Sequence, residues 1–247
     1  MIHKRGLYKT TCFGDAKYVG DPINAVRIFN EKEVDELMVL DIDASRYKSE
    51  PDYSMISNLA KECNMPLCYG GGIKNVEQIK RIIGLGVEKI AISSVAVDRP
   101  QIISEAAYKV GSQSVVGVID IKRTGIFKKP EVVVLNATVK TGLNPVSLVK
   151  QFQELGVGEI VLNFVDCDGK MLGYDYDLID NLRTSITTPL TVLGGAGKLE
   201  HIEELISRYG LIGAAAGSLF VFKGKYRAVL INYPNQEEKS QLFPNFN

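Results

Sequence analysis

The sequence predicts an α/β fold whose parallel strands close into a (β/α)8 barrel, and two observations lead to that prediction. Short apolar segments alternate with amphipathic segments along most of the chain, which is the pattern of buried parallel strands covered by helices. The two halves of the chain also match, because four features recur 124 positions apart: Gly70 and Gly194, Lys74 and Lys198, Gly86 and Gly210, Ser94 and Ser218. Two equal halves favour a closed barrel over an open sheet.

Composition excludes several classes of function. Lysine plus arginine and aspartate plus glutamate both number 29, which argues against a broad nucleic-acid surface. No apolar run approaches the length of a membrane span, and no apolar core follows the charged start of the chain, so we expect a cytoplasmic protein without a membrane partner. The four cysteines and two histidines lack metal-ligand spacing, and we expect no metal, no other cofactor and no disulfide framework.

The amino-terminal part begins with residues 3–20, which we expect to form a mobile or partly extended loop. Asp21 and Pro22 have the residue types of a helix N-cap and first helical position, so a helix is predicted over residues 23–33. Residues 37–43 follow as a strand that is apolar until its carboxyl end, where Asp41 and Asp43 stand.

From there the alternation is regular, and no linker divides it, so residues 1–247 are predicted to form one domain. Residues 124–142 interrupt the alternation and have the pattern of a small hairpin, and the polar residues 233–247 are predicted to form a flexible tail. The remaining predicted helices are 52–63, 75–84, 99–110, 145–155, 176–184 and 199–208, and the predicted strands are 66–70, 88–93, 114–121, 159–165, 190–194 and 211–216.

The duplication leaves one strand unaccounted for. The second half starts with strand 114–122, whose counterpart 124 positions earlier would lie before Met1, and only seven strong strands are present. We therefore expect the first strand of the barrel to be missing from this chain, or its place to be filled by another segment.

The carboxyl ends of barrel strands hold the reacting groups of such folds, and here they alternate between carboxylates and Gly/Ser pairs. Glycines let backbone N–H groups approach an anion, so the two Gly/Ser ends predict a long substrate with a phosphate at each end and acid-base catalysis in the middle. Asp120 ends a buried strand, where an unpaired carboxylate is costly, and is predicted to be functional. The same case is weaker for Asp41, Asp166 and Asp168, because a strand-end Asp also caps helices.

Several segments resemble the cyclase subunit of imidazole glycerol phosphate synthase. They are Leu40–Ser45, Gly70–Ile73, Gly111–Val116 with Asp120–Arg123, Asp166–Gly169 with Gly173–Asp175, and Gly194–Lys198. The resemblance implies a (β/α)8 barrel that takes ammonia from a glutaminase subunit docked at its amino-terminal face. It also implies a reaction that splits a bisphosphorylated ribulosyl aminoimidazole carboxamide nucleotide into imidazole glycerol phosphate and an aminoimidazole ribonucleotide.

The resemblance assigns roles by position. It makes Asp120 the general acid-base and Lys9 a lysine on a flexible loop. One phosphate would be bound by Gly72, Ser93 and Ser94, and the other by Asp168, Gly169, Gly195, Gly217 and Ser218. The ammonia gate at the opposite end of the barrel would include Glu36, Lys89 and Glu159, which the residues alone would assign to an ordinary solvated rim.

Departures from that family leave a second function open. The family's first-strand aspartate and the arginine of its gate would precede Met1, and Ser93 stands where the cyclase usually has asparagine. Residues 18–26 and 29–36 are more similar to a paralogous branch linked to surface-polysaccharide genes, which passes ammonia to a sugar amidotransferase. A third class, the phosphate-binding sugar isomerase barrels, is disfavoured because it gives the three gate residues no role.

Overall fold

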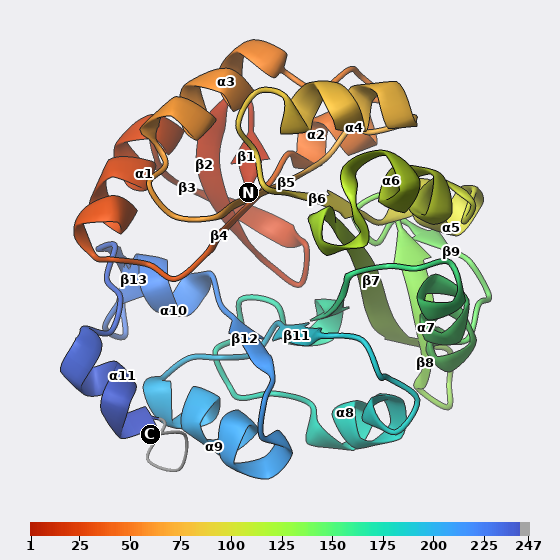
Figure 1. Cartoon of the computed structure of the whole chain (residues 1–247). Coiled ribbons are helices and arrows are strands. Elements are labelled where there is room, and N and C mark those ends of the chain that lie inside the picture. Colours follow the sequence, from red (N-terminus) through yellow and green to blue (C-terminus); the bar gives the residue numbers. More distant parts are fainter. Residues whose placement is uncertain (243–247) are drawn as a thin grey trace.

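The computed structural model describes residues 1–242, and its main sheet confirms the predicted α/β fold. Seven parallel strands, in the order β12-β11-β10-β7-β6-β5-β4, curve around an apolar interior with helices on the outside (Figure 1). The strands are β4 (Leu37–Leu40), β5 (Leu67–Gly70), β6 (Lys89–Ile92), β7 (Val115–Thr124), β10 (Glu159–Phe164), β11 (Leu190–Leu193) and β12 (Gly213–Ala215).

One principal helix follows or precedes each of these strands. Five of them begin with an Asp or Asn whose side chain accepts a hydrogen bond from a backbone N–H of the first turn, as Asp21 does for α1. The principal helices are α1 (Pro22–Glu31), α3 (Tyr53–Glu62), α4 (Val76–Ile83), α6 (Ile102–Val110), α7 (Pro145–Glu154), α8 (Tyr176–Arg183) and α9 (Leu199–Tyr209). Shorter helices follow strand ends or precede β7: α2 (Ile42–Arg46), α5 (Ser94–Asp98), η1 (Ser112–Ser114), η2 (Val165–Cys167) and α10 (Ser218–Val221).

The interior of the barrel has three layers. Each strand contributes every second side chain to it, because side chains alternate between the two faces of a sheet. The outward residues pack under the helices, whereas the inward ones form a separate apolar cluster around Val118 and Val161. The layer at the amino ends of the strands is polar, the middle layer is apolar, and the layer at the carboxyl ends is polar again. The polar layer at the amino ends contains Glu36, Lys89, Glu159 and Thr191, and the one at the carboxyl ends contains Ser93, Asp120 and Asn163. The apolar cluster that lies between them and beside them contains Met38, Leu40, Cys68, Ala91, Val116, Val118, Val161 and Leu193.

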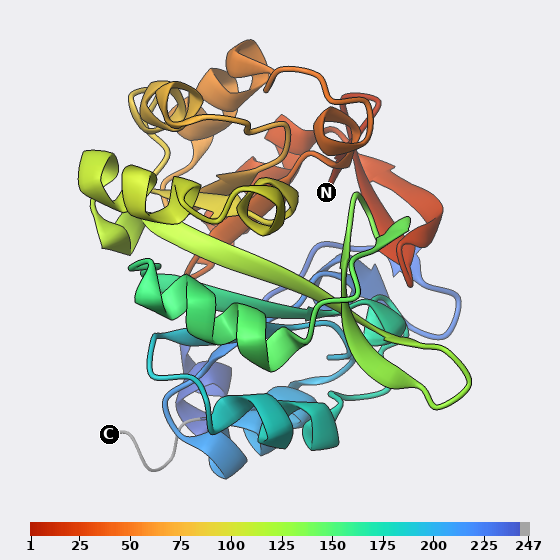
Figure 2. The ribbon, with the colours of Figure 1, turned by 90° about the vertical axis from the view of Figure 1, so that its right-hand side faces the viewer.

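Residues 3–20 are not the loop that we expected. They belong to an antiparallel sheet of β1 (Ile2–His3), β2 (Gly6–Thr11) and β3 (Gly14–Gly20). Edge-to-face contacts of Tyr8 with His3 and Tyr18 stabilise it, and Thr10 is buried against Asp168. This sheet and the hairpin after β7 lie on the same side of the barrel, at the carboxyl ends of the strands (Figure 2).

The outer strands β4 and β12 do not pair with each other within residues 1–242. Beside β4, Ile2 forms one isolated parallel bridge with Asp41, so the start of the chain lies along this edge of the sheet. That the first strand of the barrel is missing, or that another segment fills its place, stays a prediction.

The hairpin predicted within residues 124–142 is confirmed: β7 continues to Thr124 and pairs with β8 (Lys129–Val134), which pairs with β9 (Val139–Lys140). A second hairpin, β13 (Phe222–Lys223) and β14 (Ala228–Val229), follows α10. The predicted flexible tail contains α11 (Gln236–Leu242), which contacts α9 and which we did not anticipate. Residues 243–247 of that tail lie outside the described residues, and its flexibility stays a prediction.

Candidate active site

Asp120 precedes Ile121, the last residue of β7 that pairs with β10, and points into the barrel because it alternates with the inward residues Val116 and Val118. Asn163 Nδ2 donates to Asp120 Oδ1 at 2.7 Å, and Ser93 Oγ donates to Asp120 Oδ2 at 3.2 Å. Burial raises the pKa of Asp120 to about 6, although both hydrogen bonds favour the charged form. A carboxyl group with such a pKa can accept and release a proton near neutral pH.

Asn163 was missed from the sequence. It stands opposite Asp120 in the parallel register of β10 and β7, and it is 4% exposed. The available signal was a single amide in an otherwise apolar strand, two positions after an inward valine. Its amide fixes the orientation of the Asp120 carboxylate. At the barrel mouth, Asn163 and Ser93 therefore both donate hydrogen bonds to one acid, Asp120.

The second predicted phosphate site is brought together by the fold. Asp168, Gly169, Gly195, Gly217 and Ser218 come from three different strand ends, and all five line one small pocket. Ser218 is 5% exposed, and its hydroxyl finds no hydrogen-bond partner among the described residues. A buried hydroxyl facing a pocket without a partner is costly, so this pocket suits a polar ligand.

Two glycines of this pocket cannot be replaced without moving backbone. Gly195 has φ +121°, and a Cβ there would lie 2.1 Å from the carbonyl oxygen of Gly173. Gly169 has φ +68°, and a Cβ there would lie 2.2 Å from the carbonyl oxygen of Thr10. Both positions combine a left-handed conformation with close backbone approach, which only glycine permits.

Lys9 extends from β2 over the second predicted phosphate site. A Cβ added to Gly217 would lie 2.3 Å from Lys9 Nζ, so the ammonium group rests on this glycine. Burial lowers the pKa of Lys9, while the carboxylate of Asp168 opposes that shift. Asp168 is in turn held by Thr10, whose hydroxyl donates to Asp168 Oδ2 at 2.6 Å. The β2–β3 hairpin therefore places a cation at the pocket that the resemblance assigned to phosphate.

At the first predicted phosphate site, the serine hydroxyls already form hydrogen bonds with other parts of the protein. Gly72 follows β5 with φ +71°, while Ser93 and Ser94 follow the neighbouring strand β6. The Ser94 hydroxyl accepts a hydrogen bond from the backbone N–H of Leu135 at 3.2 Å, and Asn136 Nδ2 donates to the carbonyl of Ile42 at 3.0 Å. The turn between β8 and β9 thus lies across this strand end, and Ser93 is engaged with the catalytic candidate Asp120.

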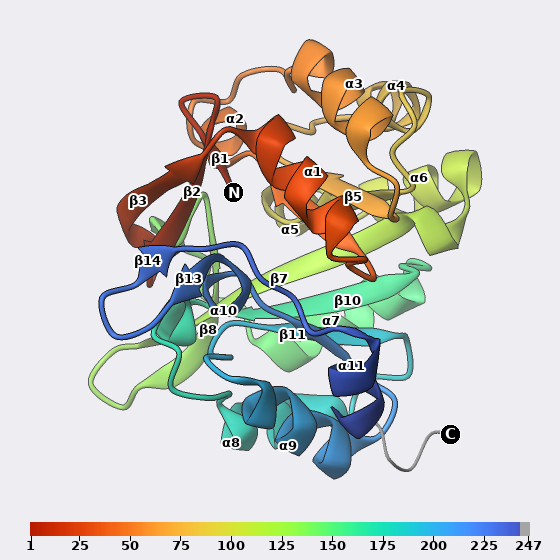
Figure 3. The ribbon, with the colours of Figure 1, turned by 90° about the vertical axis from the view of Figure 1, so that its left-hand side faces the viewer.

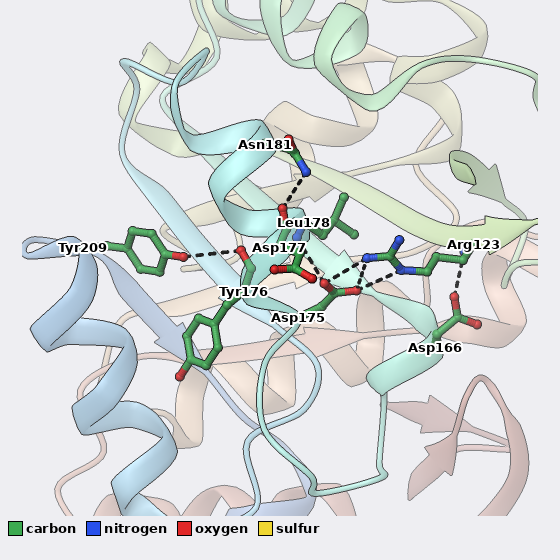
Figure 4. A network of polar contacts seen from close by, with 8 residues as sticks. All are labelled: Arg123, Asp166, Asp175, Tyr176, Asp177, Leu178, Asn181 and Tyr209. Atoms are coloured by element: carbon green, nitrogen blue, oxygen red, sulfur yellow. Dashed lines mark hydrogen bonds and ion pairs between the residues drawn. The ribbon is translucent and has the colours of Figure 1, made fainter. Parts of the chain in front are cut away.

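Asp41 and Asp166 have structural partners. Asp41 caps α2 by accepting hydrogen bonds from the backbone N–H groups of Asp43 and Ala44 at 3.0 and 2.9 Å. Burial raises the pKa of Asp41. Asp166 Oδ2 accepts the backbone N–H of Arg123 at 2.7 Å (Figure 4). The sequence offered helix capping as the alternative role for these aspartates, and Asp41 does cap a helix. Asp166 instead connects η2 to the end of β7.

An ion pair beside Asp166 was not predicted. The Arg123 guanidinium donates to both carboxylate oxygens of Asp175, the shortest distance being 2.7 Å, and Asp175 also caps α8 through the N–H of Leu178 (Figure 4). This pair raises the pKa of Arg123. It joins the carboxyl end of β7 to the start of α8, and the only sequence signal was an N-cap Asp following Gly173-Tyr174.

The three predicted gate residues form one cluster at the other end of the barrel, hereafter the basal cluster (Glu36, Lys89, Glu159). Lys89 Nζ donates to Glu36 Oε2 at 2.8 Å and to Glu159 Oε2 at 2.9 Å. Burial disfavours the charged lysine, but these two partners raise its pKa overall. Thr191 Oγ1 donates to the second oxygen of Glu159 at 2.7 Å, a contact that we did not predict. These residues are therefore not independent rim charges.

Together the fold and the site define a (β/α)-barrel protein with a buried carboxyl group at its mouth, a pocket beside it and an ionic cluster at its base. Within residues 1–242 no cluster of His, Cys, Asp and Glu side chains is arranged to hold a metal ion. None of the helices described in residues 1–242 combines the length and apolar character needed to cross a bilayer.

Known proteins identify the family. The family described as "Histidine biosynthesis protein" matches residues 4–227. A Leptospira borgpetersenii protein provisionally named imidazole glycerol phosphate synthase subunit HisF is 55% identical over 244 residues, 99% of this chain and 96% of that protein. A Vibrio vulnificus protein, provisionally named subunit hisF3 of that synthase, is 54% identical over 98% of this chain and 93% of its own. The Dictyoglomus turgidum subunit HisF is 36% identical over 87% of this chain and 85% of its own. The chain therefore belongs to the histidine biosynthesis protein family, and its resemblance to the HisF cyclase subunit is confirmed.

Proposed function

We propose that this chain is a cyclase-type barrel subunit that uses ammonia from a glutaminase partner. Its substrate would be the bisphosphorylated ribulosyl aminoimidazole carboxamide nucleotide, and its product imidazole glycerol phosphate. The observation that carries this proposal is Asp120, a carboxyl group with a pKa of about 6 held by two hydrogen bonds at the barrel mouth. Attack of ammonia and ring closure both require proton transfer, which such a group can provide.

The surroundings of Asp120 suit a substrate with two phosphates. The second predicted phosphate site supplies Lys9, the glycine backbone and the unpartnered Ser218 hydroxyl on one side. Ser94 and Gly72 follow strands on the other side. In this proposal the two ends of the substrate are anchored, and its reacting centre lies over Asp120.

The lower layers of the barrel suit the delivery of ammonia. The basal cluster lies at the amino ends of the strands, and an apolar layer that includes Cys68, Ala91 and Val118 separates it from Asp120. Neutral ammonia passes an apolar layer far more readily than ammonium, because burying a charge is costly. We therefore place the glutaminase at the amino-terminal face and assign the basal cluster as the gate.

Ammonium-driven turnover tests the proposal. With ammonium in excess, no glutaminase is needed, and the purified chain should convert the bisphosphate. D120N should remove turnover while the variant still binds the bisphosphate, because the substitution keeps shape and removes the acid-base group. Full turnover by D120N would exclude Asp120 as the acid-base group.

One observation favours a second function. The Vibrio vulnificus relative is named hisF3, and we take this number to mark a further copy of the subunit. Such a copy could deliver ammonia to a sugar amidotransferase in surface-polysaccharide synthesis and dispense with the cyclase reaction. In that case D120N would leave glutamine-dependent sugar amidation unchanged, whereas substitution of Lys89 would reduce it. The cyclase function instead predicts that D120N removes turnover of the bisphosphate.

A further inference from the structure

Arg227 reaches the second predicted phosphate site from outside the barrel. It lies in the turn of the β13–β14 hairpin, which packs beside β2 and β3 (Figure 3). Its Nη2 donates to the carbonyl of Gly169 at 2.6 Å, and Gly169 lines the pocket that contains Ser218. Lys17 Nζ donates to the carbonyl of Arg227 at 2.7 Å, which fastens the turn to β3.

The guanidinium is fixed in place rather than free in solvent. Its Cζ atom lies 5.1 Å from the ring centroid of Phe222, a cation–π contact, and its Nε is buried without a hydrogen-bond partner among the described residues. Arg227 also has φ +53°, a conformation that costs a non-glycine residue about 1 kcal/mol. An arginine with an unpaired buried donor, held against a residue that lines the pocket, is available to an anionic partner.

Two cations share this pocket with one carboxylate. Burial is the main cause that lowers the pKa of Lys9, Asp168 opposes it, and the nearby positive charge of Arg227 adds to it. The Asp168 carboxylate is already occupied by the Thr10 hydroxyl and by the backbone N–H of Phe13. Repulsion between Lys9 and Arg227 would be relieved by an anionic ligand bound between them.

We infer that Arg227 is a binding residue for a phosphate monoester dianion at this site, together with Lys9 and Ser218. The inference rests on the proposed function, and it adds a residue that the family resemblance did not assign. It also defines the ligand class, because a phosphate monoester offers three terminal oxygens to the Lys9, Arg227 and Ser218 donors, whereas a phosphodiester offers two. The site thus selects a terminal phosphate, which is the form that a bisphosphorylated substrate presents.

Calorimetric binding of methyl phosphate at pH 8, where this probe is largely dianionic, tests the inference. Wild-type protein, R227M, R227K and K225M are compared; Lys225 is exposed on the same hairpin and serves as the matched control. R227M should bind at least about 10-fold more weakly, as expected for a lost charge-assisted contact, and K225M should bind as wild type does. R227K should fall between them, because it keeps the charge and loses the planar fork.

Dimethyl phosphate, a singly charged diester, provides the second measurement. Wild type should prefer methyl phosphate over dimethyl phosphate, and R227M should lose most of that preference. If R227M does not fold, R227Q replaces it in both measurements. Equal binding of methyl phosphate by wild type and the folded variant, or no binding by wild type, would overturn the inference. These results are separate from turnover: a failed cyclase assay with Arg227-dependent phosphate binding would refute the proposed function alone.

Discussion

At the scale of the residue, the surroundings of Asp120 suit proton transfer near neutral pH but lower the stability of the folded protein there. Its folded-state pKa of about 6 lies above its ordinary value of 3.8, so folding disfavours the carboxylate. The stabilising contribution of the protonated form is complete below pH 3.8 and is lost as the pH rises through 6. At neutral pH the folded protein therefore carries a destabilising charge at the barrel mouth.

We predict that D120N is more stable than wild type at pH 7.5 by about 1–3 kcal/mol, since each pKa unit corresponds to about 1.4 kcal/mol. The difference should largely vanish at pH 4. Urea unfolding at the two pH values measures it, with D177N on the exposed first turn of α8 as the control. A D120N variant that is less stable than wild type at pH 7.5 would contradict the assigned pKa.

Two glycines of the second predicted phosphate site should respond differently to alanine. Gly217 has an ordinary backbone conformation, with φ −117°, and its added Cβ would meet only the flexible end of Lys9. G217A should keep the free energy of unfolding within about 1 kcal/mol but displace Lys9 and lower turnover at least about 10-fold. G195A meets the backbone of Gly173 at φ +121° and should lose more than about 2 kcal/mol of stability. Equal stability of the two variants would show that this backbone is freer than the contacts indicate.

The functional residues at strand ends could be predicted, because the carboxyl ends of the parallel strands all lie at the barrel mouth. Asp120 and Ser218 were found in this way, and the structure places both at the mouth. Contacts between distant segments could not be predicted. Asn163, Thr191 and Arg227 matter through partners that lie on other strands or hairpins, and no local pattern signals such a pairing.

At the scale of the element, boundaries were predicted well where a cap or a buried run defined them. Asp21 and Pro22 start α1, and β7 and β10 begin within one residue of expectation. The sheet of β1, β2 and β3 was taken for a loop, because its strands are polar and half-exposed. Tyr8 packs against Tyr18 of the neighbouring strand, and the contact between Thr10 and Asp168 ties the sheet to the barrel.

The start of α8 offers a test of one element. Asp175 both caps this helix and pairs with Arg123, so D175A removes the two interactions together. We expect D175A to lose about 1–3 kcal/mol, about half from the cap and the rest from a partly exposed ion pair. D175N can keep the cap and should lose less. Urea midpoints of these variants and of D177A as the control measure the difference, and a D175A midpoint equal to that of D177A would refute the role of Asp175.

At the scale of the whole molecule, the barrel separates two polar layers by an apolar one. The 124-residue repeat predicted two equivalent anion sites, yet the structure gives them different surroundings. The β8–β9 turn covers Ser94, whereas Lys9 and Arg227 approach the pocket of Ser218. The β2 and β8 hairpins occupy matching positions of the repeat, because β2 shifted by 124 positions covers residues 130–135, but they differ in sequence and contacts. The β13–β14 hairpin has no such counterpart, so the repeat alone could not predict this asymmetry.

The most direct test compares glutamine-driven with ammonium-driven turnover, using the glutaminase partner in the first assay. K89Q removes the cation between Glu36 and Glu159, and should lower glutamine-driven turnover at least about 10-fold while ammonium-driven turnover stays near wild type. D120N should abolish both, and K80Q, which alters only a surface pair with Glu77, should change neither. Equal losses for K89Q in the two assays, or turnover that survives D120N, would contradict the division of the barrel into a basal gate and a catalytic mouth.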